Sequence, residues 1–188
     1  ITASKTTGAL CQEDNPDFEF DIEASLRNVE AIQAFGASEF NFADLPDPSK
    51  SGLGFYSVVS GGGTSFHGSA FRDVVEISFN SDFNCAESSL SSLSQLDGQG
   101  GDNSLAINLS GVDFNGGAFS SRSSGDGYEI LYEDHILVDA KNFKDLEWEG
   151  LDDSADRLDF GSLTMSQNLD LKGRGDSVIS GSGDDYLV

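Results

Sequence analysis

The sequence predicts an all-β protein with β-solenoid or β-roll-like rungs and a β-rich insertion. Short apolar segments alternate with polar residues at a period of two, which is typical of strands. Glycine, serine and aspartate separate these segments, and the chain has 22 Gly but only 3 Pro. The last nine residues also match a repeat that builds a parallel β-helix. The three observations together favour stacked short strands over a helical fold.

Residues 1–45 form the first predicted segment, because they contain a weak copy of a later part of the chain. Leu26–Ile32 parallels Phe143–Trp148, and Ala37–Leu45 parallels Ala155–Leu163. In both copies an apolar-x-(Asn/Asp)-apolar-Glu pattern is followed by a turn and an apolar-x-Phe strand. Two alternatives remain open: a short helix over 22–34, and chance similarity between two β segments.

Residues 46–134 form the second predicted segment, a β-rich insertion or lobe. It opens with Pro46-Asp47-Pro48, a natural boundary. Its composition fits either a separate β-sandwich-like lobe or further irregular rungs. Four strands are expected in it: Phe55–Val59, Val74–Phe79, Leu105–Leu109 and Tyr128–Tyr132.

Residues 135–188 form the third predicted segment, which enters glycine-rich repeats. Period-2 alternation predicts short strands at Leu158–Phe160, Leu163–Met165 and Leu169–Leu171. Ser180–Val188 then fits the nonapeptide G-G-x-G-x-D-x-U-x, where U is a large apolar residue, at every specified position but the first. Lys172–Ile179 is a degraded copy, one residue short.

These repeats resemble those of RTX proteins, the bacterial calcium-binding proteins exported by type I secretion. The likeness covers about 136–188 well and 20–45 weakly. It implies calcium as the cofactor, bound between successive turns by carboxylate and carbonyl oxygens. The implied metal residues are Gly181, Gly183, Asp184 and Asp185 in the clean repeat, and Gly173, Gly175 and Asp176 in the weak one.

The weak repeat departs from the family's pattern in one respect. Ser177 stands where the aspartate belongs, and Asp176 sits one place earlier. The number of repeats is also small, and two cysteines are atypical of the family. An ordinary Gly/Asp hairpin turn without metal is the alternative for the whole tail.

The charge of the chain limits its partners. Thirty-three acidic and 10 basic residues give a net charge of −23. Nucleic acid is therefore an unsuitable partner, since phosphate binding needs clustered Lys and Arg. No transmembrane segment is expected, because no apolar run approaches about 20 residues. Calcium ions are the expected partners, with other copies of the chain or an extracellular polysaccharide as further candidates.

The remaining chemistry-bearing residues predict no catalytic site. Cys11 and Cys85 form either a disulfide, if the protein is extracellular, or two buried thiols. His67 and His135 are interpreted as structural or surface residues, and adjacent carboxylates such as Asp152/Asp153 are expected by chance in so acidic a chain. Three aromatic residues suit either sugar stacking or core packing, with packing favoured: Trp148, Tyr128 and Tyr132.

The sequence therefore predicts a secreted calcium-binding protein that is not an enzyme. It would act extracellularly or at the cell surface as a structural or adhesive element of a surface layer, matrix or filament, and calcium would drive its folding. The alternatives are a polysaccharide-binding or polysaccharide-cleaving β-solenoid module and an acidic β-sandwich without metal.

Overall fold

The fold was analysed in a computed structural model that describes ten ranges of the chain. These are residues 2–4, 31–35, 38–41, 54–59, 64–70, 72–79, 94–110, 118–151, 155–173 and 175–188, with side chains described from residue 65 onward. They contain sixteen strands: β1 Thr2–Ser4, β2 Ala31–Phe35, β3 Ser38–Asn41, β4 Gly54–Val59, β5 Thr64–His67, β6 Val74–Phe79, β7 Ser94–Asp97, β8 Asn103–Asn108, β9 Ala118–Ser124, β10 Gly127–Tyr132, β11 His135–Lys141, β12 Phe143–Glu149, β13 Arg157–Asp159, β14 Ser166–Asp170, β15 Ser177–Ile179 and β16 Asp185–Leu187.

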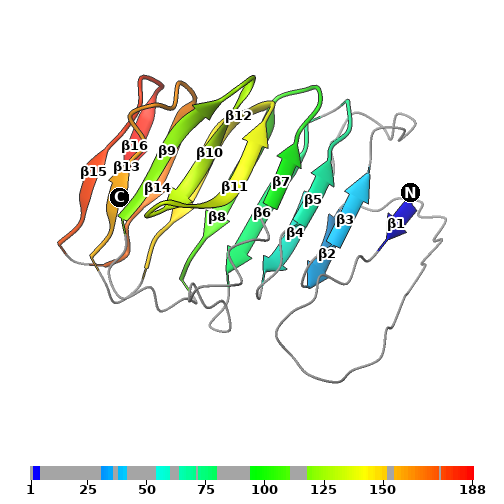
Figure 1. Ribbon diagram of the computed structural model, residues 1–188, viewed down its shortest axis with the longest axis horizontal. Helices are drawn as coiled ribbons and strands as arrows, with labels where there is room; N and C mark the ends of the chain where they lie inside the picture. The colour runs from blue at the N-terminus through cyan, green and yellow to red at the C-terminus, as the bar shows by residue number, and fades with distance from the viewer. Residues whose placement is uncertain are drawn as a thin grey trace.

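The strands form two sheets that lie face to face (Figure 1). The nine-stranded sheet has the order β1-β3-β5-β7-β11-β10-β9-β13-β15, and the seven-stranded sheet has the order β16-β14-β12-β8-β6-β4-β2. From β2 to β8, and again from β12 to β16, successive strands alternate between the two sheets. Strands of all three predicted segments therefore share both sheets.

The seven-stranded sheet is parallel throughout its described pairs. Parallel neighbours need a crossover connection, which in α/β proteins is usually a helix. Here each crossover runs through one strand of the other sheet, except that from β8 to β12, which runs through β9, β10 and β11, and the described residues contain no helix. Each turn between the sheets must therefore satisfy its own backbone groups close to the core.

The predicted β-solenoid or β-roll-like rungs with an insertion are wrong. The nine-stranded sheet is mixed, and the described strands close into neither a barrel nor a solenoid. Strands β9, β10 and β11 are antiparallel neighbours within one sheet. The physical reason is two tight loops, Gly125-Asp126 and Glu133-Asp134, in which Gly125 (φ 58°) and Glu133 (φ 53°) take left-handed conformations. Such two-residue loops join antiparallel strands.

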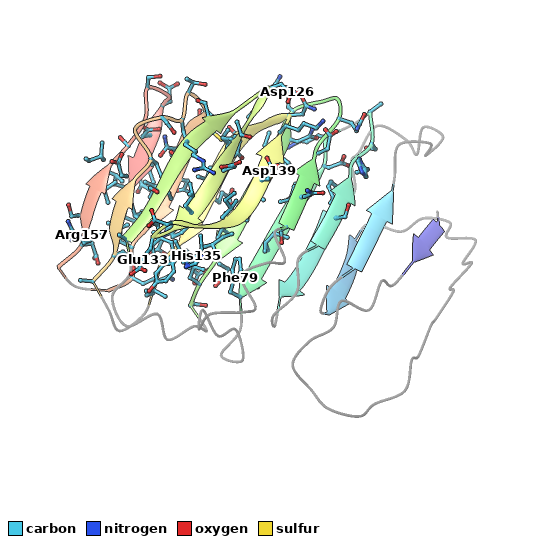
Figure 2. All side chains as sticks on the ribbon, in the orientation of Figure 1. Phe79, Asp126, Glu133, His135, Asp139 and Arg157 are labelled. Carbon is cyan, nitrogen blue, oxygen red and sulfur yellow. The ribbon has the colours of Figure 1, made fainter. Side chains whose placement is uncertain are left out.

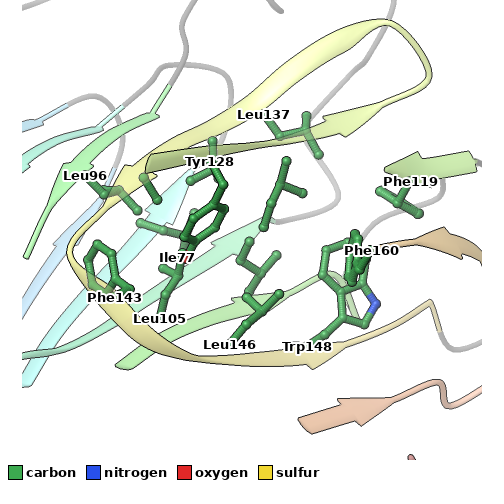
Figure 3. Packing of buried hydrophobic residues seen from close by; sticks show 14 of the residues in the cluster. Ile77, Leu96, Leu105, Phe119, Tyr128, Leu137, Phe143, Leu146, Trp148 and Phe160 are labelled. Carbon is green, nitrogen blue, oxygen red and sulfur yellow. The ribbon is translucent and has the colours of Figure 1, made fainter. Parts of the chain in front are cut away.

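The hydrophobic core fills the space between the sheets (Figure 3). In the seven-stranded sheet, Ile77, Ile107, Trp148 and Leu169 are aligned in register and all at most 2% exposed. Trp148 also makes edge contacts with Phe119, at 4.9 Å between ring centroids, and with Phe160, at 5.2 Å. This aromatic cluster joins β9 and β12 and the residue after β13.

Most of the strands expected from alternation are present. The four expected strands between 46 and 134 correspond to β4, β6, β8 and β10, and in β6 every second residue is buried. The expected strand at Leu163–Met165 is instead irregular backbone in the connection between β13 and β14. The alternative helix over 22–34 is wrong for its last residues, because Ala31–Phe35 is a strand. Residues 22–30 lie outside the described residues.

Among the described residues no helix is long and apolar enough to cross a membrane.

Candidate cation site

Four fully buried polar side chains mark the turns between the sheets. They are Asp73, Asn103 and Asp156, each 0% exposed, and Gln167, 1% exposed. Each lies immediately before a strand or within its first two residues, where the chain has just crossed between the sheets. Buried polar groups are normally hydrogen-bonded, so the partners of these four residues show what each turn requires.

A glycine lies against each of these side chains. A Cβ placed on Gly68 would be 2.6 Å from Oδ2 of Asp73, and one on Gly150 would be 2.2 Å from Oδ2 of Asp156. Gly98 lies in the same way against Asn103, and Gly181 against the amide of Gln167. The glycines are required here because only a residue without a side chain leaves room for the buried polar group.

The Asp73 turn is satisfied by protein groups. The carboxylate accepts hydrogen bonds from the backbone N–H of Ser69 (2.6 Å) and from its hydroxyl (2.9 Å). Oδ1 of Asn103, in the next turn, accepts from the backbone N–H of Asp73 at 2.8 Å. The amide nitrogen of Asn103 donates to the carbonyls of Gly98, Gly100 and Asn142 at 2.6–3.0 Å.

The Asp156 turn repeats this arrangement with a carboxylate in place of the amide. Oδ1 of Asp176 accepts from the backbone N–H of Asp156 at 2.8 Å, as Oδ1 of Asn103 does for Asp73. Oδ2 of Asp156 accepts from the N–H of Leu151 at 3.1 Å. Oδ1 of Asp156 is buried and has no hydrogen-bond partner among the described residues. The Asp156 turn therefore pairs two carboxylates, those of Asp156 and Asp176, whereas the Asp73 turn pairs the carboxylate of Asp73 with the amide of Asn103.

The electrostatics of Asp156 reflect this mismatch. Burial raises the pKa of Asp156 from 3.8 to about 6, the hydrogen bond from Leu151 offsets part of that rise, and the charge of Asp176 adds to it. At neutral pH the group is still mostly ionised, so the edge of the core holds a negative charge whose Oδ1 has no hydrogen-bond partner among the described residues. A cation beside Oδ1 would remove both penalties.

Backbone oxygens complete an oxygen-rich cradle at this turn. The position that a Cβ would occupy on Gly150 lies 3.0 Å from the carbonyl oxygen of Leu171 and 3.3 Å from that of Asp170, besides Oδ2 of Asp156. Within the described part of the chain, no three His, Cys, Asp or Glu side chains converge on one point. Carbonyl oxygens must therefore supply part of any ligand set here, as they do for calcium.

A second pair of stacked turns lies at the opposite ends of β13 and β15, where the chain continues to β14 and β16. Oδ1 of Asp185 accepts from the backbone N–H of Gln167 at 3.2 Å. Both amide atoms of Gln167 are buried without a hydrogen-bond partner in the described residues. Gly181 packs against the carbonyl of Leu163 as well as this amide, and Gly183 packs against the carbonyl of Met165. The glycines of the clean repeat thus let its turn lie directly on the preceding turn.

The predicted metal residues fall into two groups. Gly173, Gly175 and Asp176 belong to the turn before β15, whereas Gly181, Gly183 and Asp184 belong to the turn before β16 and Asp185 is the first residue of that strand. Asp176 and Asp185 make equivalent hydrogen bonds to the preceding turn, so Asp176, not Ser177, takes the aspartate position of the weak repeat. Asp184 is exposed, and its side chain accepts none of the hydrogen bonds described for this turn.

Sequence reasoning missed Asp156 and Gln167, because neither lies in the glycine repeats. A signal for Asp156 was present: Gly68, Gly98 and Gly150 are each followed five or six residues later by a buried Asp or Asn at or directly before the start of a strand. Asp156 follows other acidic residues closely in the sequence, so charge alone did not distinguish it.

The other candidate residues are accounted for by packing or lie outside the description. Trp148 and Tyr128 are buried, 2% and 6% exposed, so core packing is confirmed for them and neither offers a face to a sugar; Tyr132 packs against the same core. Cys11, Cys85, Asp152 and Asp153 lie outside the described residues.

Both histidines are exposed; His67 is the last residue of β5 and His135 the first residue of β11, so they lie at opposite strand ends of the nine-stranded sheet. His135 lies next to Glu133 in the β10–β11 hairpin, far from Asp126 at the other hairpin (Figure 2). His67 lines a depression of about 400 Å³ together with Asp97, Asp139 and Lys141. Asp97 is engaged there by the amide of Asn142 at 2.7 Å and by Lys141 at 3.1 Å, which favours a structural role.

Comparison with known proteins yields no match to a family model, to a curated protein or to a solved structure. The chemistry of the turns is therefore the basis for inferring a function.

Proposed function

We propose that the protein is a secreted calcium-binding protein whose fold is completed by calcium at the Asp156–Asp176 turn. The observation that carries the proposal is the buried Oδ1 of Asp156, which has no hydrogen-bond partner among the described residues while a second carboxylate lies beside it. A buried carboxylate is normally paired or coordinates a metal ion. The resemblance of the tail to RTX repeats supports the same ion.

Calcium suits this set of oxygens better than other common ions. Asp156 and Asp176 supply carboxylates, and the carbonyl oxygens of Asp170 and Leu171 lie around the same glycine, Gly150, as Oδ2 of Asp156. Calcium accepts six to eight oxygens in a flexible geometry, whereas magnesium demands a near-ideal octahedron and keeps its waters. Zinc prefers nitrogen and sulfur ligands. Gln167 and Asp185 would hold a second ion through the amide oxygen of Gln167.

Binding at this turn would be coupled to folding. The unfolded chain does not bring Asp156 and Asp176 together, so calcium binds the folded state and shifts the equilibrium towards it. At ten times the dissociation constant, this linkage contributes about 1.4 kcal/mol per site. Millimolar extracellular calcium suits the affinities of extracellular modules, about 10⁻⁴–10⁻³ M. The folded protein would then serve as a structural or adhesive element at the cell surface.

The test is calorimetric titration of calcium and magnesium into chelator-treated protein. We expect calcium binding in the submillimolar to millimolar range and much weaker magnesium binding. Asp156→Asn should weaken calcium binding at the Asp156 turn at least tenfold. Asp134→Asn is the matched control, because it also removes one charge, but from the exposed loop that joins β10 to β11. Equal binding by the two variants would overturn the proposal.

A further inference from the structure

The depression of about 400 Å³ beside His67 opens on the outer face of the nine-stranded sheet. Val138 and Ala140 are buried in the core, at most 1% exposed, so alternation along β11 directs Asp139 and Lys141 to the outside. Asp126 and Asp139 lie towards the same end of this sheet (Figure 2). The volume is within the range of small-molecule sites, which are usually concave and carry a few converging polar groups.

Strand ends aligned in register build the floor of this depression. Five adjacent strands, β5, β7, β11, β10 and β9, contribute one residue each to a row: His67, Asp97, Lys141, Gly127 and Ser124. Gly127 is the position of this row without a side chain, and a Cβ on it would be 2.3 Å from the carbonyl oxygen of Ala140. The row therefore has a gap between Lys141 and Ser124.

Most charges in this depression and beside it are already paired. Lys141 donates to Oδ2 of Asp97 at 3.1 Å, and the amide of Asn142 donates to Oδ1 of the same carboxylate at 2.7 Å. Next to them, Arg122 forms an ion pair with Glu129. These pairs fix the walls of the depression and leave little net charge for a ligand.

Asp139 is the exception. It is half-buried in the adjacent row, in register with Gln95 and Glu129, and has no hydrogen bond or ion pair among the described residues. Burial raises the pKa of Asp139, the charges of Glu129 and Asp126 add to the rise, and the charge of Lys141 offsets part of it. A positively charged group in the depression would relieve this repulsion.

The other lining residues narrow the kind of cation. Within the described ranges no three His, Cys, Asp or Glu side chains converge, so a metal ion would find at most two of them here. Phe66 and Leu96 are at most 2% exposed, so these two apolar side chains offer no surface to an apolar amine. The remaining polar groups are the amide of Gln95, the imidazole of His67 and the hydroxyl of Ser124, which both donate and accept hydrogen bonds, as sugar hydroxyls do.

We propose that this depression binds a sugar residue that carries a protonated primary amine. The amine pairs with the carboxylate of Asp139, and the ring hydroxyls exchange hydrogen bonds with the amide of Gln95 and the hydroxyl of Ser124. An acidic sugar does not fit, because Asp126 and Asp139 would repel its carboxylate.

This recognition goes beyond the proposed calcium function and uses none of its ligands. The depression lies at the last residue of β9, whereas Asp156 precedes β13, whose first residue pairs with the first residue of β9. The two sites are therefore at opposite strand ends. An amino sugar of an extracellular polysaccharide would supply the ligand for the proposed adhesive role.

The probe is a fluorescently labelled trimer of glucosamine, titrated with the intact protein in calcium and followed by anisotropy. The titration is done at about pH 6, where the amines are protonated, and in about 150 mM salt, which screens unspecific attraction to the acidic chain. We expect saturable binding of one trimer per protein. The uncharged trimer of N-acetylglucosamine should bind at least tenfold more weakly, and spermidine, an amine without hydroxyls, should compete at least tenfold less well than unlabelled glucosamine trimer.

Asp139→Asn should weaken binding of the glucosamine trimer at least tenfold and leave the fold intact, because it removes a repelled carboxylate from the outer face. Asp134→Asn, which removes one charge from the exposed loop before β11, is the matched control and should bind as the wild type does. Absence of saturable binding, equal binding of the acetylated trimer, equal competition by spermidine, or an equal loss in the two variants would each overturn the proposal. Calcium titration of Asp139→Asn should match the wild type, so failure of sugar binding is distinguishable from failure of the calcium function.

Discussion

The Asp73 turn and the Asp156 turn each bury a carboxylate where the chain crosses between the sheets, but they surround it with different groups. Asp73 receives two hydrogen bonds from Ser69, and the amide of Asn103 caps its N–H. Asp156 receives one from Leu151, is capped by a second carboxylate, and keeps a bare buried oxygen among the described residues. The first turn is satisfied by protein groups, and the second is the one at which we propose a cation.

The largest change in stability is expected from a substitution that makes the Asp73 turn resemble the Asp156 turn. Asn103→Asp would direct a carboxylate at the carbonyls of Gly98, Gly100 and Asn142, which now accept from the amide. We expect a loss of about 3–5 kcal/mol in the free energy of unfolding in chelator, because the substitution buries an unpaired negative charge against three carbonyl oxygens. Calcium should restore part of it. Urea denaturation in chelator and in calcium measures both, and no loss in chelator would show that the two turns are not equivalent.

The second effect is the pH dependence of the chelator-treated protein. The folded pKa of Asp156, about 6, exceeds its ordinary value of 3.8, so the folded state keeps this proton longer than the unfolded chain does. The contribution of Asp156 to stability is therefore complete below about pH 4 and is lost as the pH rises to about 6. The loss is on the order of 3 kcal/mol.

Comparison of wild type with Asp156→Asn isolates this contribution from that of the other carboxylates. The difference in unfolding free energy between the two proteins should change between pH 4 and 6 in chelator and should be small in saturating calcium. A pH-independent difference in chelator would mean that Asp156 is not strained by its surroundings.

Glycine substitutions should separate the two turns with a somewhat smaller effect. Gly150→Ala places a Cβ 2.2 Å from Oδ2 of Asp156, and Gly68→Ala places one 2.6 Å from Oδ2 of Asp73. Each should cost about 1–3 kcal/mol through overpacking. Only Gly150→Ala should also weaken the response of the melting temperature to calcium, and Gly161→Ala, with its nearest contact at 3.3 Å, should do neither. Equal calcium responses in all three variants would show that calcium does not bind next to Gly150.

The smallest effect should be a gain in stability. Asp176→Asn keeps an oxygen for the N–H of Asp156, as Asn103 supplies one for Asp73, and removes the like charge that raises the pKa of Asp156. We expect a gain of about 1 kcal/mol in chelator from the loss of this repulsion, and a smaller response to calcium. Thermal unfolding with and without chelator measures it; a destabilised variant in chelator would contradict the expectation.

The sequence was sufficient for many strands because their side chains alternate, as in Val74–Phe79, where one face is buried. It was not sufficient for the sheet arrangement, since β9 is mostly serine and lacks an alternating apolar pattern. The two loops that reverse β9–β11 depend on Gly125 and Glu133, of which only the glycine is an obvious turn residue. Local propensity therefore located strands, while two short turns determined how they pair.

The candidate site was partly predictable for a similar reason. Asp176 and Asp185 lie in glycine repeats whose pattern carries the chemistry, so they were identified from the sequence alone. Asp156 and Gln167 come from the preceding layer, and only the register of β13 with β15 and of β14 with β16 brings them to the repeats. When a site lies between two successive turns and only one of them carries a sequence motif, the sequence identifies only the residues of that turn.

The most direct test of this account is thermal unfolding of the wild type and of Asp156→Asn, each in chelator and in 10 mM calcium, a concentration about ten times the weakest expected dissociation constant. The account predicts a large calcium-dependent rise in the melting temperature of the wild type, little rise with magnesium, and a much smaller calcium response in Asp156→Asn. A wild-type melting temperature that is the same in chelator and in calcium would contradict it.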